Sequence, residues 1–268
     1  KKAVEHAKAC GYVFHVGPEL EFFLFDTDDS GRPTTNTSEK AGYFDLGPLD
    51  LGENVRRDMV LTLEDMGFEI ESSHHEVAPA QHETFKLAVR TIAKRHGLHA
   101  TFMPKPKAGV DGSGMHINMS LSKNGQNIFY DGADANGLSQ EAYYFLGGIM
   151  AHSKAITAIT NPLVNSYKRL VPGYEAPVHI TWATSNTSSL VRVPGSREPG
   201  SKRIELRSPD PSCNPYLALA VCLEAGLDGI RRKLEPADCI NENIYATSKE
   251  EMAARHIDVL PGTLREAP

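Results

Sequence analysis

The sequence predicts an α+β fold in which helices pack against a curved, mainly antiparallel sheet. Segments that alternate apolar and polar residues, the period of a strand, are interspersed with segments of helical spacing. Their order lacks the regular strand–helix alternation of a doubly wound parallel sheet. The chain has 268 residues, 40% of them apolar, and no Ser/Gly/Pro-rich linker divides it. We therefore expect one large domain.

Six segments show the alternation of strands, and a seventh follows a turn. The six span residues 13–25, 68–73, 98–105, 117–121, 179–185 and 203–207. The seventh, 126–130, follows Lys123-Asn124-Gly125, and Asn-Gly is a typical hairpin turn. Five segments have helical spacing, three of them ended by glycine. These five span residues 1–10, 54–66, 84–96, 139–159 and 215–232.

The composition narrows the classes of partner. The net charge is −6 and no Lys/Arg run occurs, which disfavours nucleic acid. No apolar run approaches the roughly 18 residues of a membrane-spanning helix, and the first residues carry no signal-peptide core. The four cysteines are scattered without a C-x-x-C pair, so we expect reduced thiols. These features indicate a cytoplasmic protein with small-molecule partners.

Two acidic segments are candidates for metal binding. Glu19 and Glu21 lie two residues apart in an apolar strand, so both side chains face the same side of the sheet. Their repulsion is costly unless a cation or protons neutralise it. Glu76 and Glu83 frame a turn that contains proline, and oxygen ligands suit Mg²⁺ or Mn²⁺. The alternative for Glu19 and Glu21 is a solvent-facing strand edge. The histidines of the second segment, His74, His75 and His82, are interpreted as surface residues or as neighbours of the metal ligands.

Two later segments carry polar strand faces and a glycine loop. The run Lys105–His116 leads into a strand whose one face carries His116, Asn118 and Ser120. Glycines before that strand let the backbone approach a ligand, although most such loops are only turns.

The second of these segments, 203–207, places Arg203, Glu205 and Arg207 on one face. Such a face binds metal and phosphate together, or forms a surface ladder of ion pairs. Upstream, Arg169 and Glu175 lie on a Pro/Gly-punctuated segment long enough to form a lid.

In their order along the chain, these segments resemble glutamine synthetase, the ATP-dependent ligase of glutamate and ammonia. The matching runs are GPELEFFLFD, SHHEVAPAQHE, MPKPKAGVDGSGMH, NSYKRLVPGYEAP and RIELRSPDPSCNPYLALA. The bacterial and archaeal type is most similar. The resemblance implies that residues 1–268 form the family's catalytic domain. It also implies that the family's N-terminal sheet domain and C-terminal helices are absent from this chain.

The resemblance further implies a set of site residues. One divalent ion, Mg²⁺ or Mn²⁺, would bind Glu21, Glu76 and Glu83, and a second would bind Glu19, His116 and Glu205. Glutamate would contact Asp111, Gly112, Arg169 and Arg207. The nucleotide would lie near Glu71, Asn118, Ser120, Arg192 and Arg203. The catalytic residues would be Glu175, Arg192 and Arg207.

The implied reaction transfers the γ-phosphoryl group of ATP to glutamate, giving γ-glutamyl phosphate, which ammonia then attacks. Metal ions and arginines would spread the charge of the phosphoryl group. Glu175 would take a proton from ammonium. The family implies a homo-oligomer, a dodecamer of two stacked rings, in which the N-terminal domain of one subunit completes a neighbour's active site.

The chain departs from the family at three internal positions. The family carries several helical turns between the counterparts of Glu83 and Thr84, including an aromatic residue near the adenine, whereas here the two are adjacent. Asp111 replaces the usual asparagine. Thr187 replaces an arginine that reaches phosphate or substrate, and threonine brings no charge.

These departures leave two alternatives beside glutamine synthesis. One is a γ-glutamyl ligase that acts on another amine, with a roomier pocket around Glu175. The other is a catalytically weakened relative kept as an assembly protein. Thr187 favours the weakened relative, and the intact acidic residues disfavour it.

Overall fold

The computed structural model describes residues 1–37, 52–68, 70, 73–74, 76–77, 82–174, 176–196, 198–242, 244, 247, 249–255 and 257–267. Among these residues a six-stranded sheet has the order β1-β6-β10-β9-β8, with β7 paired to β6. Its strands are β1 (Val13–Leu20), β6 (Met115–Lys123), β7 (Gln126–Asn127), β8 (Trp182–Ala183), β9 (Val191–Arg192) and β10 (Ile204–Leu206). Two small sheets pair β2 (Phe23–Asp26) with β5 (Leu98–Thr101), and β3 (Ser73–His74) with β4 (Glu76–Val77).

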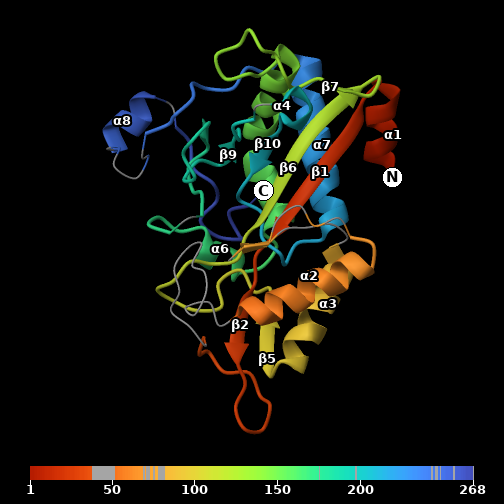
Figure 1. The fold of residues 1–268 in the computed structure, drawn as a ribbon. Coiled ribbons are helices and arrows are strands. Elements are labelled where there is room, and N and C mark those ends of the chain that lie inside the picture. The colour runs from red at the N-terminus through yellow and green to blue at the C-terminus, as the bar shows by residue number, and fades with distance from the viewer. Residues whose placement is uncertain are drawn as a thin grey trace.

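Helices cover these sheets in two regions. They are α1 (Lys2–Ala9), α2 (Glu53–Asp65), α3 (His82–Arg95), α4 (Gln140–Ala151), α5 (Ser153–Thr160), α6 (Ser166–Arg169), α7 (Pro215–Arg232) and α8 (Lys249–Ala254). In Figure 1, α4 and α7 lie behind the long β1–β6 pair, while α2 and α3 lie beside β5 in the lower part. Only the β8–β9 pair is parallel among the strand pairs of the described residues. The expected α+β class with a mainly antiparallel sheet is therefore confirmed.

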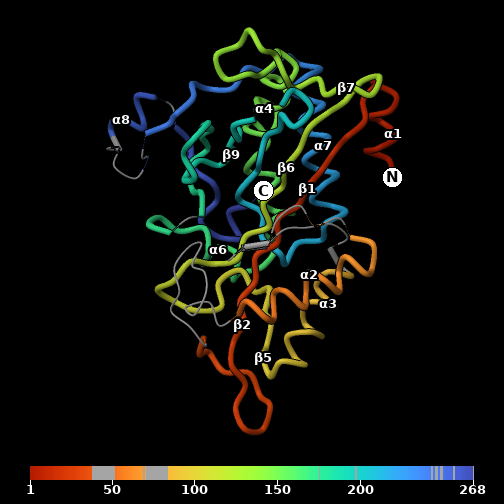
Figure 2. Tube along the Cα trace, viewed as in Figure 1, coloured from red at the N-terminus to blue at the C-terminus, as the bar shows by residue number. Residues whose placement is uncertain are grey.

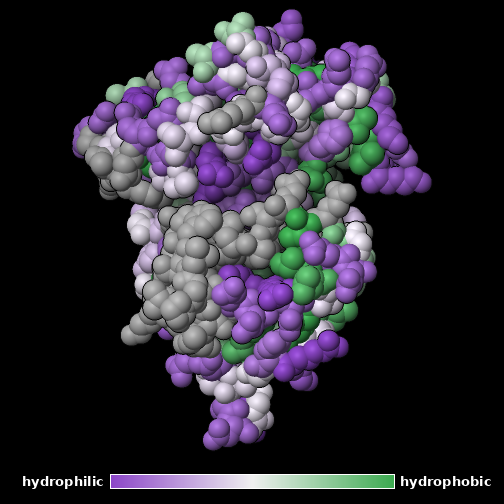
Figure 3. Space-filling model, viewed as in Figure 1, coloured by the Kyte–Doolittle hydropathy of each residue, from purple (hydrophilic) through white to green (hydrophobic). Residues whose placement is uncertain are grey.

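Alternation along β6 separates a core face from a polar face, as the sequence predicts. Ile117, Met119 and Leu121 are fully buried in one apolar cluster with residues of α4 and α7. Asn118 and Ser120, between them, are partly exposed. On the face drawn in Figure 3, most of the coloured surface is hydrophilic. The polar face of β6 is thus the one available for chemistry.

The predicted strand over 13–25 is two strands, because the chain changes partner at Glu21. β1 pairs with β6 up to Leu20, whereas β2 pairs with β5 from Phe23. Between them, the Glu21 N–H donates to Gly114 O at 2.9 Å, outside the regular ladder. Figure 2 shows the trace passing here from the upper to the lower part of the molecule. The acidic segment therefore lies where the two parts meet.

Other predicted strands are shorter than expected, because side chains interrupt the ladder or the partner strand ends. Asn241 Oδ1 accepts from the N–H groups of Thr184 and Ser185, so β8 ends at Ala183 within the predicted 179–185. β5 ends at Thr101, opposite the first residue of β2, and the Met103 N–H donates to Thr101 Oγ1. The predicted 126–130 strand stops where Asn127 Oδ1 accepts from the Phe129 N–H.

The remaining differences concern helix ends and missed elements. The predicted helix 139–159 is broken at His152, where the Ser153 hydroxyl donates to Met150 O and competes with the backbone ladder. Phe68 and Ile70 lie outside β3, because the Phe68 N–H closes the end of α2 by donating to Leu63 O. The sequence did not predict β4, β9, α6 or α8, each of six residues or fewer.

The sequence predicts reduced thiols and no membrane-spanning helix. All four cysteines are free thiols, as expected, and burial raises the pKa of the Cys222 thiol to about 12. Among the described residues no helix is long and apolar enough to cross a membrane.

Glycines let α4 and α7 pack at very short range. A Cβ added at Gly148 would lie 2.1 Å from Ala225 O, and one at Gly229 would lie 2.1 Å from Tyr144 O. Both obstacles are backbone atoms of the opposite helix, so neither rotates away. The contact of these two helices behind the sheet therefore depends on the absence of side chains at these positions.

We predict that Gly229→Ala lowers the free energy of unfolding by about 2 kcal/mol, since an overpacking cost of about 3 kcal/mol outweighs the roughly 1 kcal/mol gained in helix propensity. Urea unfolding measures the change. Gly195→Ala is the control, because no heavy atom lies within 4 Å of its added Cβ. Equal stability of the two variants would contradict close helix packing.

Candidate active site

Glu19, Glu21 and His116 form a compact cluster at the end of the β1–β6 pair. One ligand atom of each residue lies within 4.8 Å of the others. Glu19 and His116 are direct partners in the register of the two antiparallel strands. His116 Nδ1 is 3.6 Å from Glu19 Oε1, and its Nε2 is 3.7 Å from Glu21 Oε1. Glu19 and Glu21 therefore lie on the same side, as the sequence predicts, and the imidazole of His116 lies beside both carboxylates.

The backbone of the glycine loop fixes Glu21 in this cluster. The Gly114 N–H donates to Glu21 Oε2 at 2.5 Å, while Gly114 O accepts from the Glu21 N–H. A Cβ at Gly114 would lie 2.8 Å from His116 Nε2 and 2.5 Å from Arg169 Nη2. Only glycine allows this close approach, which explains the sequence Gly-Ser-Gly before β6.

The charges around Glu19 keep its carboxylate ionised. Burial alone would raise the pKa of Glu19, but the His116 side chain 3.6 Å away and the charges of Arg207 and Arg192 lower this pKa to about 2. Metal coordination requires the ionised form. Any stability from this interaction is present above the unfolded pKa near 4.5 and is lost as the pH falls toward 2.

Glu205 lies beside the cluster but is paired with two arginines. Its side chain is fully buried, and its Oε1 is 3.4 Å from His116 Nδ1. Arg207 Nη1 donates to Oε1 at 2.6 Å, and Arg192 Nε donates to Oε2 at 2.5 Å. The face of β9 and β10 thus combines two guanidiniums with a carboxylate next to the acidic cluster.

Residues expected near the nucleotide continue this face. Asn118 Oδ1 accepts from Arg203 Nε at 2.9 Å, and Asn118 is the β6 partner of Glu205. Ser120 follows on the same face of β6, opposite His15 of β1. The structure therefore places Asn118, Ser120 and Arg203 along one row that begins at His116.

Arg169 packs against Gly112 of the glycine loop. A Cβ at Gly112 would lie 2.3 Å from Pro104 O and 3.0 Å from Arg169 Cγ. Arg169 is buried, and its terminal nitrogens donate to backbone carbonyls of residues 207–209. Burial lowers its pKa, against the charges of Glu21 and Asp210. Asp111 is exposed at the edge of the same loop.

Thr187, one of the departures from the family pattern, contacts Arg207 through its backbone. Arg207 Nε donates to Thr187 O at 3.1 Å, and the Thr187 side chain is exposed. The backbone of Thr187 therefore helps to hold Arg207.

Several predicted site residues lie outside what the structure describes. Glu71 and Glu175 fall outside the described residues, and the side chains of Glu76 and Glu83 do as well. Sequence reasoning overlooked the contacts of Lys105 with Asn165 and Tyr174, which join segments about 60 residues apart. The repeated lysines of the run Lys105-Pro106-Lys107 were the only local signal.

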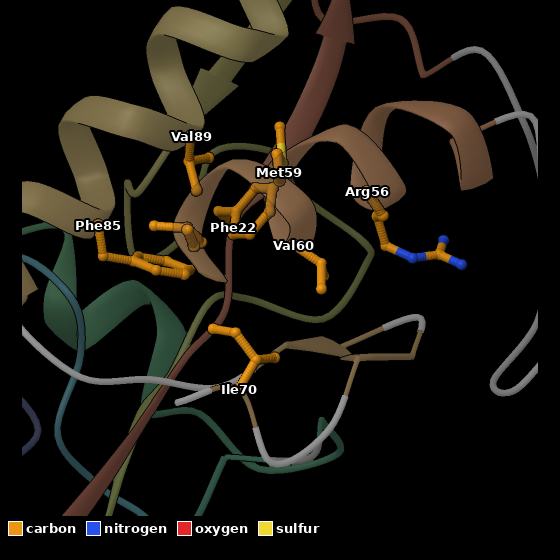
Figure 4. Close-up of a pocket in the computed structure, with 8 residues that line it drawn as sticks. Phe22, Arg56, Met59, Val60, Ile70, Phe85 and Val89 are labelled. Atoms are coloured by element: carbon orange, nitrogen blue, oxygen red, sulfur yellow. The ribbon is translucent and has the colours of Figure 1, made fainter. Parts of the chain in front are cut away.

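Two hollows in the described part of the chain are not lined by the acidic cluster. One holds only about 10 Å³ and lies between α2 and α3, with Phe22, Ile70 and Phe85 in its wall (Figure 4). That is about the space of one water molecule, so it is a packing gap and not a ligand site. The other is an open groove of about 360 Å³ along α5 and α7, lined by His152, Glu224 and Asp228 among others.

Comparison with known proteins identifies the family. The family model of the glutamine synthetase catalytic domain matches residues 1–268. A glutamine synthetase of Clostridium saccharobutylicum is 57% identical, and one of Methanosarcina mazei is 53% identical, each over 100% of this chain. The chain spans only 64% and 63% of the length of these two relatives. A solved structure described as a GmaS/ADP complex has a TM-score of 0.83 at 33% identity, covering 99% of this chain and 65% of that one.

A fold that gathers two carboxylates, an imidazole and neighbouring arginines is typical of proteins that bind metal and phosphate, and the matched family is more specific. The chain belongs to the glutamine synthetase catalytic-domain family, in agreement with the resemblance of its motifs.

The alignment with the Clostridium relative also bears on the short connection before Thr84. It has 283 positions over all 268 residues of this chain, so at least about 15 positions of the relative face no residue here. In the structure, α3 begins at His82 and continues as one helix through Thr84. About 15 residues make about four turns of helix, which is the size of the stretch that the resemblance implies between the counterparts of Glu83 and Thr84.

We predict that Glu205→Gln lowers the free energy of unfolding by about 3 kcal/mol, because it leaves buried arginine charge uncompensated. Urea unfolding with a chelator present measures this without metal effects. Asp228→Asn is the matched control, since Asp228 also contacts two arginines, which are 76% and 54% exposed. Exposed pairs contribute about 1 kcal/mol or less, so equal losses would contradict the prediction.

Proposed function

We propose that this chain is the catalytic part of a glutamine synthetase, which joins ammonia to the γ-carboxylate of glutamate at the expense of ATP. The observation that carries the proposal is the cluster of Glu19, Glu21 and His116, with arginines of β9 and β10 beside it, in a member of this family. Paired carboxylates and arginines meet the need to bind metal and phosphate together. The ADP in the related GmaS structure supports nucleotide binding in this family.

The residues present fit divalent metal ions. Two carboxylates and an imidazole within 4.8 Å of one another suit Mg²⁺ or Mn²⁺. In the proposal one ion is held by Glu21, Glu76 and Glu83, and a second by Glu19, His116 and Glu205. Bound metal would supply positive charge next to the phosphate oxygens.

The protein's own cations complete this charge. Arg192 and Arg207 are held by Glu205, so their remaining N–H groups are fixed in direction before substrate arrives. We propose that they stabilise the phosphoryl group during transfer. In the same proposal Glu71, Asn118, Ser120 and Arg203 contact the nucleotide, and Asp111, Gly112 and Arg169 contact glutamate.

The second half of the reaction requires a proton acceptor. We assign this role to Glu175, which would take a proton from ammonium so that ammonia attacks γ-glutamyl phosphate. The assignment rests on the sequence, since Glu175 lies outside the described residues.

We further propose a cytoplasmic homo-oligomer, a dodecamer of two stacked rings, for the whole protein. The support is the family, whose catalytic-domain model matches residues 1–268. Sizing and light scattering of the full-length protein test this, and a monomer would contradict it.

We predict that millimolar Mn²⁺ raises the melting temperature by about 5 °C when free metal is about 100 times the Kd, which corresponds to roughly 2.7 kcal/mol. Glu21→Gln should reduce the shift, because it removes a carboxylate ligand of one of the two proposed ions. Glu224→Gln, on the exposed face of α7, should preserve it. If melting with Mn²⁺ equals melting with a chelator, the metal assignment is wrong.

We predict that Glu175→Ala lowers glutamine formation about a hundredfold at neutral pH but spares ATP and glutamate binding. The loss should lessen at high pH, where free ammonia is abundant. The assay compares ATP turnover with glutamate and ammonia, or with a panel of amines, in the full-length protein. Glu64→Ala on α2 is the control. Faster turnover with another amine than with ammonia would replace the proposed substrate.

A further inference from the structure

Lys105 links the glycine loop to the segment that follows α5. The Lys105 N–H donates to Asn165 Oδ1 at 2.8 Å, and Asn165 Nδ2 donates to Lys105 O at 3.0 Å. One amide side chain thus satisfies both backbone groups of Lys105, as a strand partner would. The pair fixes the start of the glycine loop against residues 60 positions later in the chain.

The Lys105 ammonium contacts both segments at once. Its Nζ lies 3.6 Å from the centre of the Tyr174 ring and donates to Val110 O. Burial lowers the pKa of Lys105, against the charge of Asp111, which raises it. Such partial desolvation is the condition in which a cation–π contact is strong. One cation therefore holds Tyr174 and the middle of the loop together.

The far end of the loop is fixed at the acidic cluster. Gly114 donates to Glu21, and Gly112 has no room for a Cβ against Pro104 O and Arg169. The loop is thus held at Gly114 by the cluster, at Gly112 by packing, and at Val110 by Lys105. Between these points lies exposed Asp111, whose position Lys105 influences through its neighbour Val110.

We propose that Lys105 is a positioning residue that holds the glycine loop and Tyr174 at a fixed separation beside the acidic cluster, so that the loop is preorganised for the amino-acid substrate. The proposal rests on the proposed function, in which residues 111 and 112 contact glutamate. Lys105 itself acts through the loop and the ring. A loop already held in its binding geometry loses less entropy on binding, so the effect falls mainly on KM.

The test compares Lys105→Met with Lys107→Met in the full-length protein, because Lys107 is an exposed lysine two residues away. Lys105→Met should lower kcat/KM for glutamate about tenfold, mainly through KM. Lys107→Met should stay within twofold. The Mn²⁺-induced shift in melting temperature should persist in both variants, since the cluster ligands are untouched.

Two rescue variants separate the cation–π contact from general damage. Lys105→Arg keeps a cation that stacks on aromatic rings, and Tyr174→Phe keeps the ring, so both should retain at least half of kcat/KM. Tyr174→Leu should lose about as much as Lys105→Met. Combining Tyr174→Leu with Lys105→Met should add little, whereas multiplied losses would overturn the proposal.

Hydrogen exchange gives a readout that does not depend on the reaction. Peptides covering 104–114 and 165–174 should exchange faster in Lys105→Met and not in Lys107→Met. If the wild type forms no glutamine, the proposed function fails, and exchange alone decides whether Lys105 fixes the loop. If the wild type is active, unchanged glutamate kinetics in Lys105→Met overturn the positioning role.

Discussion

The structure depends on balancing three acidic side chains that converge where β1, β6 and β10 meet. Glu19 and Glu21 share the cluster with His116, and Glu205 is fully buried beside it. Carboxylates so close and so shielded from water would repel strongly if unpaired. Arg192 and Arg207 offset this repulsion directly, and the Gly114 N–H contributes a further donor. The strands, the glycine loop and the arginine-bearing segments each bring a donor to these carboxylates, and this pairing constrains how they are placed.

The glycine loop approaches its neighbours unusually closely at two positions. Gly112 and Gly114 admit Pro104 O, His116 and the Arg169 side chain into space that any Cβ would fill. Arg169 then gives its terminal donors to carbonyls of residues 207–209, which fixes the chain just after β10. The same residue that packs under the glycine loop thereby orients the segment that begins with Arg207. The glycine loop, Arg169 and the chain after β10 therefore form one packed unit, in which Arg169 contacts both of the others.

Local patterns predicted much of this, and long-range pairing explains what they did not predict. Residues 215–232 form α7 as expected, because Pro215 and helical spacing are local signals. The strand over 13–25 was divided because its first part pairs with β6, about 100 residues later, and its second part with β5, about 75 residues later, which no local period reveals. The convergence of Glu19 and Glu21 followed from alternation, whereas the pairing of Glu205 with Arg192 depends on the register of β9 with β10. Other site roles came from the family resemblance alone.

Alternation along β6 and β10 also separates the source of stability from the site of chemistry. On β10, Ile204 and Leu206 lie in the apolar core, while Glu205 between them faces the arginines. On β6, Ile117 and Met119 are in the same core, whereas His116 and Asn118 lie on the polar face, beside β10. Desolvated charges contribute little net stability, so the apolar face and the helices behind it must supply the free energy that holds the charged face in place. A site that requires fixed, partly dry charges is therefore built on strands whose other face lies in the core.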